Sequence, residues 1–405
     1  MGQLKDQAES FTIVLMDDGF KKLIEALPGY EKQLTELSEI VLANLVMISE
    51  IPSPTFSEQR RVEFILNRMT EYGLQNTSTD EVGNALGVLP GTKGDKNILV
   101  VAHLDTNIEK TVDHHVTLQT NRVIGPGVAD NGLGLAAMTS LPAILEFLDI
   151  KLDSNLVLMG SARSLGRGDI EGLRFFLSNT DMPFTAAICV EGVKLGRISY
   201  SSIGMMRCEI SYSVPEEYDW TQFGAVGSIV VINEVINRIL EIPLPKRPRT
   251  NIMMGSIRGG TSYDKMATNA VLQFEIRSES GDMVLELRDQ IDHIVAEVSS
   301  NTGAEISFDV FAQRRPGGMP FAHPLAKNTT EIMRSLDIKP RISPSTSELS
   351  ALISNNIPAL TIGIADGENI ALPGESVFIE PIYKGLSQLL GIILAIDKGY
   401  CNESE

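Results

Sequence analysis

Short apolar runs recur along this chain at the spacing of strands in an α/β sheet, with helical or loop stretches between them. The runs are residues 84–90, 97–102, 155–160 and 186–192, with a later run at 358–365 and a closing helical pattern at 384–397. Residues 131–148 show the apolar spacing of a helix and lie between two of the runs. Since strands that alternate with helices form a sheet covered by helices, the pattern predicts an α/β domain.

A second pattern occupies residues 202–313, between the earlier strands and the run at 358–365. Its elements are a strand, a helix, two strands, a helix and a strand, at residues 205–214, 227–240, 251–257, 270–276, 283–298 and 304–311. This β-α-β-β-α-β order is that of the ferredoxin-like split motif. The sequence therefore predicts an α/β domain made of residues 37–201 and 314–400, with an inserted α+β domain between its two parts.

The length of 405 residues exceeds what one hydrophobic core usually organises, which agrees with two domains. Residues 1–36 precede the predicted α/β domain as a helical arm. A helical pattern at residues 20–27 is broken by Pro28 and Gly29. The arm either packs as a helix on the α/β domain or extends to a partner.

The charge balance excludes two classes of partner. A net charge of -18 and an isoelectric point of about 4.8 would repel nucleic acid and anionic membranes.

No apolar stretch reaches the roughly 18 residues that span a bilayer, and the first residues lack the layout of a signal peptide. The three cysteines share no CxxC spacing, so neither a disulfide framework nor a thiolate zinc site is indicated. We therefore expect a cytoplasmic protein.

Polar side chains follow several of the predicted strands, where sites form in open α/β sheets. One strand runs directly into His103 and Asp105, and another ends at Glu191. The glycine-rich loop before the next helix carries Asp130. An imidazole and two carboxylates suit zinc or a similar divalent ion, with water in the open position. The alternatives are that Asp130 only caps a helix and that His103 is a buried histidine with satisfied hydrogen bonds.

Six segments carry a family resemblance when they are read in order. They are VVAHLDTN, GPGVADNGLGLAAM, GSARSLGRGDIEGLRFF, ICVEG, IRGGTSYDKM and RPGGMPFAHPL. Together they resemble the zinc metallopeptidase family of tripeptide aminopeptidase, acetylornithine deacetylase, aminoacylase and glutamate carboxypeptidase, from about Leu34 to Asp397. The resemblance implies a zinc-peptidase-like catalytic domain, a mixed sheet flanked by helices, with an inserted ferredoxin-like lid. Because such lids often mediate dimerisation, it also implies a homodimer through residues 202–313.

The resemblance also implies roles for the residues at the strand ends. Asp130 would be the bridging carboxylate of a two-metal site. His103 and Glu191 would complete the first metal site, and Asp105 would orient His103. The peptide bond between Asp130 and Asn131 is expected to be cis. The first site would then hold one divalent ion, for which zinc is expected, with manganese and cobalt as alternatives.

The sequence departs from the family pattern at the second metal. The family carries two consecutive glutamates, of which the first is the general base and the second binds metal two; here Ser164 and Leu165 stand in those places. The family's histidine ligand of metal two is replaced by Ala371. Serine is no base near neutral pH without help, and neither leucine nor alanine offers a side-chain lone pair. We therefore predict that the second ion and the usual general base are lost.

Three further positions belong to the predicted substrate cleft. Tyr218 stands where a lid histidine normally reaches substrate across the dimer, and Asp264 replaces the asparagine of the usual GGTSVN segment. Glu375 keeps a family-like position, with an exposed loop acid as the equal alternative. Asp169 and Glu171 lie near the missing pair, but their spacing does not aim them at a bound water.

Two functions remain open from the sequence. The first is hydrolysis of the amide bond of a peptide or N-acyl amino acid by a water that one ion activates. The missing base counts against it, because a general base typically contributes about a hundredfold to ten-thousandfold. The second is a non-catalytic binding or regulatory subunit, a pseudoenzyme that partners an active homologue, and the sequence alone favours this one. A one-metal enzyme of unrelated chemistry is a third possibility that the sequence does not specify.

Overall fold

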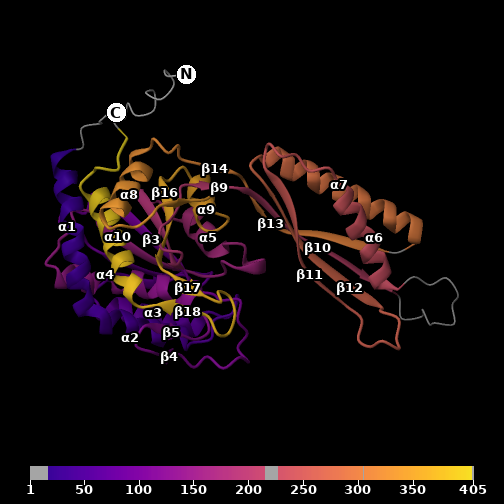
Figure 1. The fold of residues 1–405 in the computed structure, drawn as a ribbon, viewed down its shortest axis with the longest axis horizontal. Helices are drawn as coiled ribbons and strands as arrows, with labels where there is room; N and C mark the ends of the chain where they lie inside the picture. The colour runs from indigo at the N-terminus through magenta and orange to yellow at the C-terminus, as the bar shows by residue number, and fades with distance from the viewer. Residues whose placement is uncertain (1–16, 215–226, 304, 404–405) are drawn as a thin grey trace, which may run out of the picture.

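The chain forms two bodies, a large α/β domain and a smaller α+β domain beside it (Figure 1). The computed structural model describes residues 17–214, 227–303 and 305–403. An eight-stranded sheet is the centre of the first body, and a four-stranded sheet is the centre of the second. The predicted fold class, an α/β domain with an inserted α+β domain, is confirmed.

The large sheet is mixed, with the strand order β1-β2-β6-β3-β7-β16-β8-β15. Its strands are β1 Gln75–Thr79, β2 Ala85–Leu89, β3 Asn97–His103, β6 Asn155–Ser161, β7 Ala186–Val193, β8 Arg197–Ser199, β15 Arg341–Ile342 and β16 Ala359–Ala365. The central strands β6, β3, β7 and β16 run parallel. Their carboxyl ends therefore meet at one edge of the sheet, where ligand sites form in such folds.

Helices cover both faces of this sheet because its central strands are apolar on both sides. In β3, Ile98 and Val100 join one core, and Leu99 and Val101 join another. The helices of the first core are α1 Asp18–Leu34, α2 Ser38–Ser49, α3 Gln59–Glu71, α4 Leu133–Phe147, α8 Pro324–Ser335 and α10 Glu380–Asp397, and those of the second are α5 Glu171–Asn179 and α9 Leu349–Ser354. Continuous apolar runs are typical of parallel strands buried on both faces.

One described segment, Val128–Phe147, is long and apolar enough to cross a membrane, but 89% of its apolar window is buried inside the protein. It consists of α4 and the turn before it. Nearly every residue of α4 is buried against the sheet and α2, so its apolar composition is that of a core helix.

Helix α1, which makes up most of the described part of residues 1–36, packs along α10 near the end of the chain. The Leu27 carbonyl accepts a hydrogen bond of 2.9 Å from the Ser387 hydroxyl. The ring of Phe20 lies 5.6 Å from that of Tyr400, measured between centroids. This helix is therefore part of the core of the α/β domain.

The inserted domain has the predicted order of elements. They are β10 Gly204–Ser213, α6 Ser228–Glu241, β11 Thr250–Gly259, β12 Asn269–Ser278, α7 Gly281–Thr302 and β13 Ile306–Arg314. The strands pair antiparallel in the order β11-β12-β10-β13. Alternate residues of β12, such as Leu272 and Phe274, are buried against α6 and α7, which fits a sheet with helices on one face.

Two small sheets and three short turns complete the fold. The sheets are β9 Ser201–Ser202 with β14 Gly317–Gly318, and β4 Thr117–Leu118 with β5 Arg122–Ile124, β18 Ser376–Phe378 and β17 Gly367–Glu368. The turns are η1 Thr35–Leu37, η2 Val128–Gly132 and η3 Gly166–Gly168. Pairing of β18 with β5 brings the loop before β18 close to the loop that carries Asp130.

Candidate metal centre

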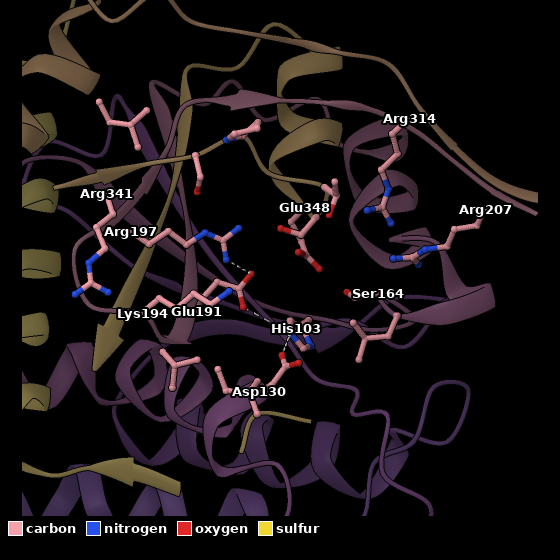
Figure 2. Close-up of a pocket in the computed structure, with 18 residues that line it drawn as sticks. His103, Asp130, Ser164, Glu191, Lys194, Arg197, Arg207, Arg314, Arg341 and Glu348 are labelled. Carbon is pink, nitrogen blue, oxygen red and sulfur yellow. Dashed lines mark hydrogen bonds and ion pairs between the residues drawn. The ribbon is translucent and has the colours of Figure 1, made fainter. Parts of the chain in front are cut away.

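His103, Asp130 and Glu191 meet at the carboxyl edge of the large sheet (Figure 2). His103 ends β3, Glu191 lies near the end of the neighbouring parallel strand β7, and Asp130 lies in the turn before α4. The His103 Nε2 atom is 3.1 Å from Asp130 Oδ1 and 3.9 Å from Glu191 Oε2. All three ligand atoms lie within 4.8 Å of one another. Such a group has the size and the donor atoms of a site for one divalent ion.

Asn131 fixes Asp130 beside β7. Its side chain donates from Nδ2 to the Val190 carbonyl at 2.8 Å and accepts a bond of 2.8 Å from the Gly192 amide. A Cβ on Gly192 would lie 2.3 Å from the Ala129 carbonyl oxygen, so glycine is required for this close approach. The peptide bond between Asp130 and Asn131 is cis, as the resemblance implied.

Asp105 contacts the imidazole of His103 mainly through its main chain. The His103 Nδ1 atom lies 2.9 Å from the Asp105 carbonyl oxygen and 3.5 Å from its carboxylate oxygen Oδ1. The other carboxylate oxygen accepts from the Thr55 hydroxyl and the Leu165 amide, both at 2.8 Å. A ring that donates from Nδ1 presents the Nε2 lone pair to the cluster, as a metal ligand must.

Arg61 supports the end of β3 from inside the protein. Its side chain is fully buried and donates to the Leu104 carbonyl at 2.8 Å and the Ile51 carbonyl at 2.6 Å. Burial lowers the pKa of Arg61 to about 10, so the side chain keeps its charge at neutral pH. The main chain between His103 and Asp105 is thereby fixed.

The three candidate ligands influence one another's protonation. Burial works against a charged imidazole, but hydrogen bonds to Asp105 and Asp130 hold the pKa of His103 well above its usual value. Burial also disfavours an ionised Asp130, yet the hydrogen bond with His103 keeps the pKa of this carboxyl below its usual value. Burial raises the pKa of Glu191, while the Arg197 guanidinium 3.5 Å away favours its charged form. In the ion-free cluster, His103 is therefore in its charged form at neutral pH, with a proton on each ring nitrogen.

Binding of a divalent ion at pH 7 is expected to release about one proton per ion, because the ion needs the Nε2 lone pair that this proton occupies. Below the His103 pKa, the apparent affinity should rise about tenfold per pH unit. Calorimetric titrations in buffers of different ionisation enthalpy count the protons. A binding enthalpy that does not depend on the buffer would contradict the prediction, and His293→Ala, which changes an exposed histidine of α7, is the matched control.

No carboxylate stands at the positions of the missing glutamate pair. Ser164 is buried and its hydroxyl lies 3.3 Å from that of Ser161, while Leu165 holds Asp105 through its amide. Both residues line the cavity described below. Asp169 and Glu171 are not among the residues that line it. Asp169 pairs with Arg174 and Arg314, and Glu171 pairs with Arg163.

Glu375 is completely buried, so the interpretation of it as an exposed loop acid is wrong. Its Oε1 accepts from the Ala129 amide at 3.1 Å and its Oε2 from the Ala371 amide at 3.0 Å. Burial raises the pKa of Glu375 to about 7. This burial could not be predicted from the sequence, because it follows from the long-range pairing of β18 with β5. Glu375 joins the backbone of Ala371 to the residue before Asp130.

Of the other two predicted cleft residues, only Asp264 belongs to the described part of the chain, and it is not at this site. Asp264 lies exposed in the segment between β11 and β12 and does not line the cavity. Tyr218 lies outside the described residues.

The cluster opens into a cavity of about 630 Å³ between the two domains. Five basic side chains line it, although the chain as a whole is strongly acidic: Lys194, Arg197, Arg207, Arg314 and Arg341. Arg207 and Arg314 come from β10 and β13 of the inserted domain. Among the described residues, neither Lys194 nor Arg341 has an ion-pair partner, so both remain available to an anionic ligand.

Glu348 also lines this cavity, and sequence reasoning missed it. It stands directly before α9, is 3% exposed, and its Oε1 atom has no hydrogen-bond partner within the described parts of the chain. No motif surrounds it. Its single sequence signal is an acidic residue before a short apolar helix, which is common at helix starts.

No protein-family model matches the sequence, and no curated protein sequence matches it. Solved structures do match. The dipeptidase Dug1p from Saccharomyces cerevisiae has a TM-score of 0.78 at 11% identity, over 93% of this chain and 99% of that one. An M20 family metallo-carboxypeptidase from Sulfolobus solfataricus has a TM-score of 0.71 at 13% identity, over 88% and 99%.

A dinuclear metal-binding peptidase of the M20 family from Bacillus subtilis has a TM-score of 0.61 at 13% identity, over 90% of this chain and 99% of that one. Identities this low show likeness of fold, and they agree with the resemblance carried by the six sequence segments. This chain has the fold of the M20 family metallopeptidases.

Proposed function

We propose that this protein is a hydrolase that works with one divalent ion and cleaves an amide bond in a small acidic molecule, such as a peptide or an N-acyl amino acid. The observation that carries the proposal is the group His103, Asp130 and Glu191, which opens into a cavity. Structural zinc sites are closed by four protein ligands, whereas catalytic sites use three and leave a position for water or substrate. Among the described residues, the group offers three.

The donor set fits zinc, with manganese and cobalt as alternatives, because it combines one imidazole nitrogen with carboxylate oxygens. When bound, the ion would polarise the substrate carbonyl and make water a better nucleophile. The protein's own residues hold the ligands in place. Asp105 orients the ring of His103, and Asn131 fixes the loop of Asp130.

The basic side chains of the cavity support an acidic substrate. Arg197 is engaged by Glu191, and Arg314 by Asp169 at 3.2 Å. Lys194 and Arg341 face the cavity without such partners among the described residues, and Figure 2 shows both beside Glu191 and Arg197. A substrate carboxylate would pair with these two cations, which places its amide bond toward the metal centre.

The second candidate is a non-catalytic subunit that binds the same class of molecule. The replacement of the usual glutamate pair by Ser164 and Leu165 favours it. A homodimer through residues 202–313, or a complex with a complete homologue, belongs to this proposal. Apolar side chains exposed on the inserted domain support it, among them Val230 on α6 and Ile257 on β11. The three free, buried cysteines agree with a reducing compartment such as the cytoplasm.

The test is a screen of dipeptides and N-acyl amino acids with protein loaded with one equivalent of zinc or cobalt. Amine release that stops with a chelator, and is absent from His103→Ala, would support hydrolysis. Substrates with two carboxylates should be preferred over their amides. Calorimetry on the same compounds separates the candidates, since binding without amine release supports the second and excludes the first. Neither binding nor release would exclude both.

A further inference from the structure

We propose that Glu348 takes the place of the missing general base and accepts the proton of the water that attacks the substrate. The inference rests on the proposed hydrolytic function. It concerns a residue to which the resemblance gives no role, and it answers the main objection that the sequence raises against catalysis.

Glu348 lies in the cavity into which the candidate metal centre opens. It lines the same cavity as His103, Asp130 and Glu191, and it stands directly before α9, which packs on the other core of the sheet. Figure 2 shows its carboxylate on the opposite side of His103 from Asp130, with Ser164 nearby. The side chain therefore faces the space above the candidate metal centre.

Its carboxylate is buried without the partners that buried carboxylates normally have. The residue is 3% exposed and Oε1 has no hydrogen-bond partner in the described structure. The nearby guanidinium groups are engaged elsewhere, Arg197 with Glu191 and Arg314 with Asp169. Glu348 does not cap α9 with its side chain either. Burial of an unpaired carboxylate oxygen is unfavourable, so such a group calls for a functional explanation.

The position suits a base better than a ligand. Glu348 is not part of the group whose ligand atoms lie within 4.8 Å of one another, so it stands farther from at least one of them. It nevertheless lines the same cavity as those ligands. A general base has to reach the attacking water, directly or through one further water, and does not need to contact the ion.

Ser164 supplies the room for this arrangement. The family's general base would stand at Ser164, whose small side chain instead turns to Ser161 at 3.3 Å. Ser164 and Glu348 line the same cavity. The segment after β6 therefore places no carboxylate at position 164 that would occupy the space next to the Glu348 carboxylate.

The proton transfers balance without any further reagent. As the water oxygen forms its bond to the carbonyl carbon, Glu348 Oε1 accepts one water proton. The same proton then passes to the amide nitrogen while the carbon–nitrogen bond breaks. The products are a carboxylic acid and an amine, Glu348 is ionised again, and nothing is oxidised or reduced.

The test compares Glu348→Gln with wild type, since glutamine keeps the size of the side chain and removes its basicity. The matched control is Glu63→Gln, which changes an exposed glutamate on α3. We expect Glu348→Gln to bind one zinc ion as wild type does, with kcat reduced about a hundredfold or more and KM nearly unchanged. A kcat within about threefold of wild type would overturn the inference.

A second readout separates this inference from the proposed function. The visible spectrum of the cobalt-loaded protein changes with pH when protons are lost near the ion. Removal of a neighbouring negative charge should lower the midpoint of that change by about one pH unit in Glu348→Gln. Wild-type protein that cleaves no amide would overturn the hydrolytic function. In that case an unchanged cobalt midpoint would also overturn the role of Glu348, and a lowered midpoint would support its action at this site.

Discussion

Protein carrying Asp130→Ala is expected to lose its divalent ion, with an affinity at least about a hundredfold below that of wild type. Asp130 lies 3.1 Å from the Nε2 atom of His103 and is the acceptor that balances the imidazolium in the ion-free protein. Its removal leaves two ligands, too few to hold zinc against buffer and water. Elemental analysis of protein purified without chelator should give one ion per wild-type chain and none in the variant.

The control for this experiment is Asp264→Ala, which removes an exposed aspartate of the inserted domain. It should retain the ion, which excludes a general effect of lost charge. Retention of the ion by a folded Asp130→Ala protein would place the metal elsewhere. Absence of any ion from folded wild type would leave the cavity as a binding site for an organic anion alone.

Restoring the three lost positions should create a second metal site. The variant Ser164→Glu, Leu165→Glu, Ala371→His is expected to bind two zinc ions per chain, because the new side chains at positions 165 and 371 supply the lone pairs that leucine and alanine lack. Leu165 already lines the cavity. The backbone of Ala371 is linked through Glu375 to the residue before Asp130. Ala371 has a φ of 65°, a conformation that histidine adopts more readily than most residues do.

Zinc stoichiometry after desalting measures the result. Ala371→His alone is the matched control and should remain at one ion, since a histidine and the shared Asp130 are too few ligands for a second. If the folded triple variant still binds one ion, the second site has been lost through changes beyond these three residues. The replacements at positions 164, 165 and 371 would then not explain why the chain holds only one ion.

Much of the fold could be predicted because the strong signals are local. The apolar run at residues 97–102 matches β3, and the run at 155–160 matches β6, since a strand buried on both faces must be apolar throughout. The order of strands and helices in the inserted domain could also be predicted from its local apolar patterns. The short strand β15 could not be predicted, because two residues carry no periodicity and owe their conformation to pairing with β8.

The candidate site was predictable in part for the same reason. His103 and Glu191 lie at or near the ends of long apolar strands, and neighbouring parallel strands end at the same edge of the sheet. The burial of Glu375 and Glu348 could not be predicted, because burial of an acidic residue in a loop depends on partners far away in the sequence. Glu375 is buried by the pairing of β18 with β5, and Glu348 by the packing of α9 on the second core.

The order of the strands in the large sheet has a consequence for synthesis on the ribosome. Strand β16 lies between β7 and β8, yet more than a hundred residues, including the whole inserted domain, are translated between β8 and β16. The inserted domain is one continuous stretch and can fold as soon as it emerges. The nascent α/β domain must keep a gap in its sheet next to β7, the strand that carries Glu191, until the last fifth of the chain arrives, so the candidate site is completed late in synthesis.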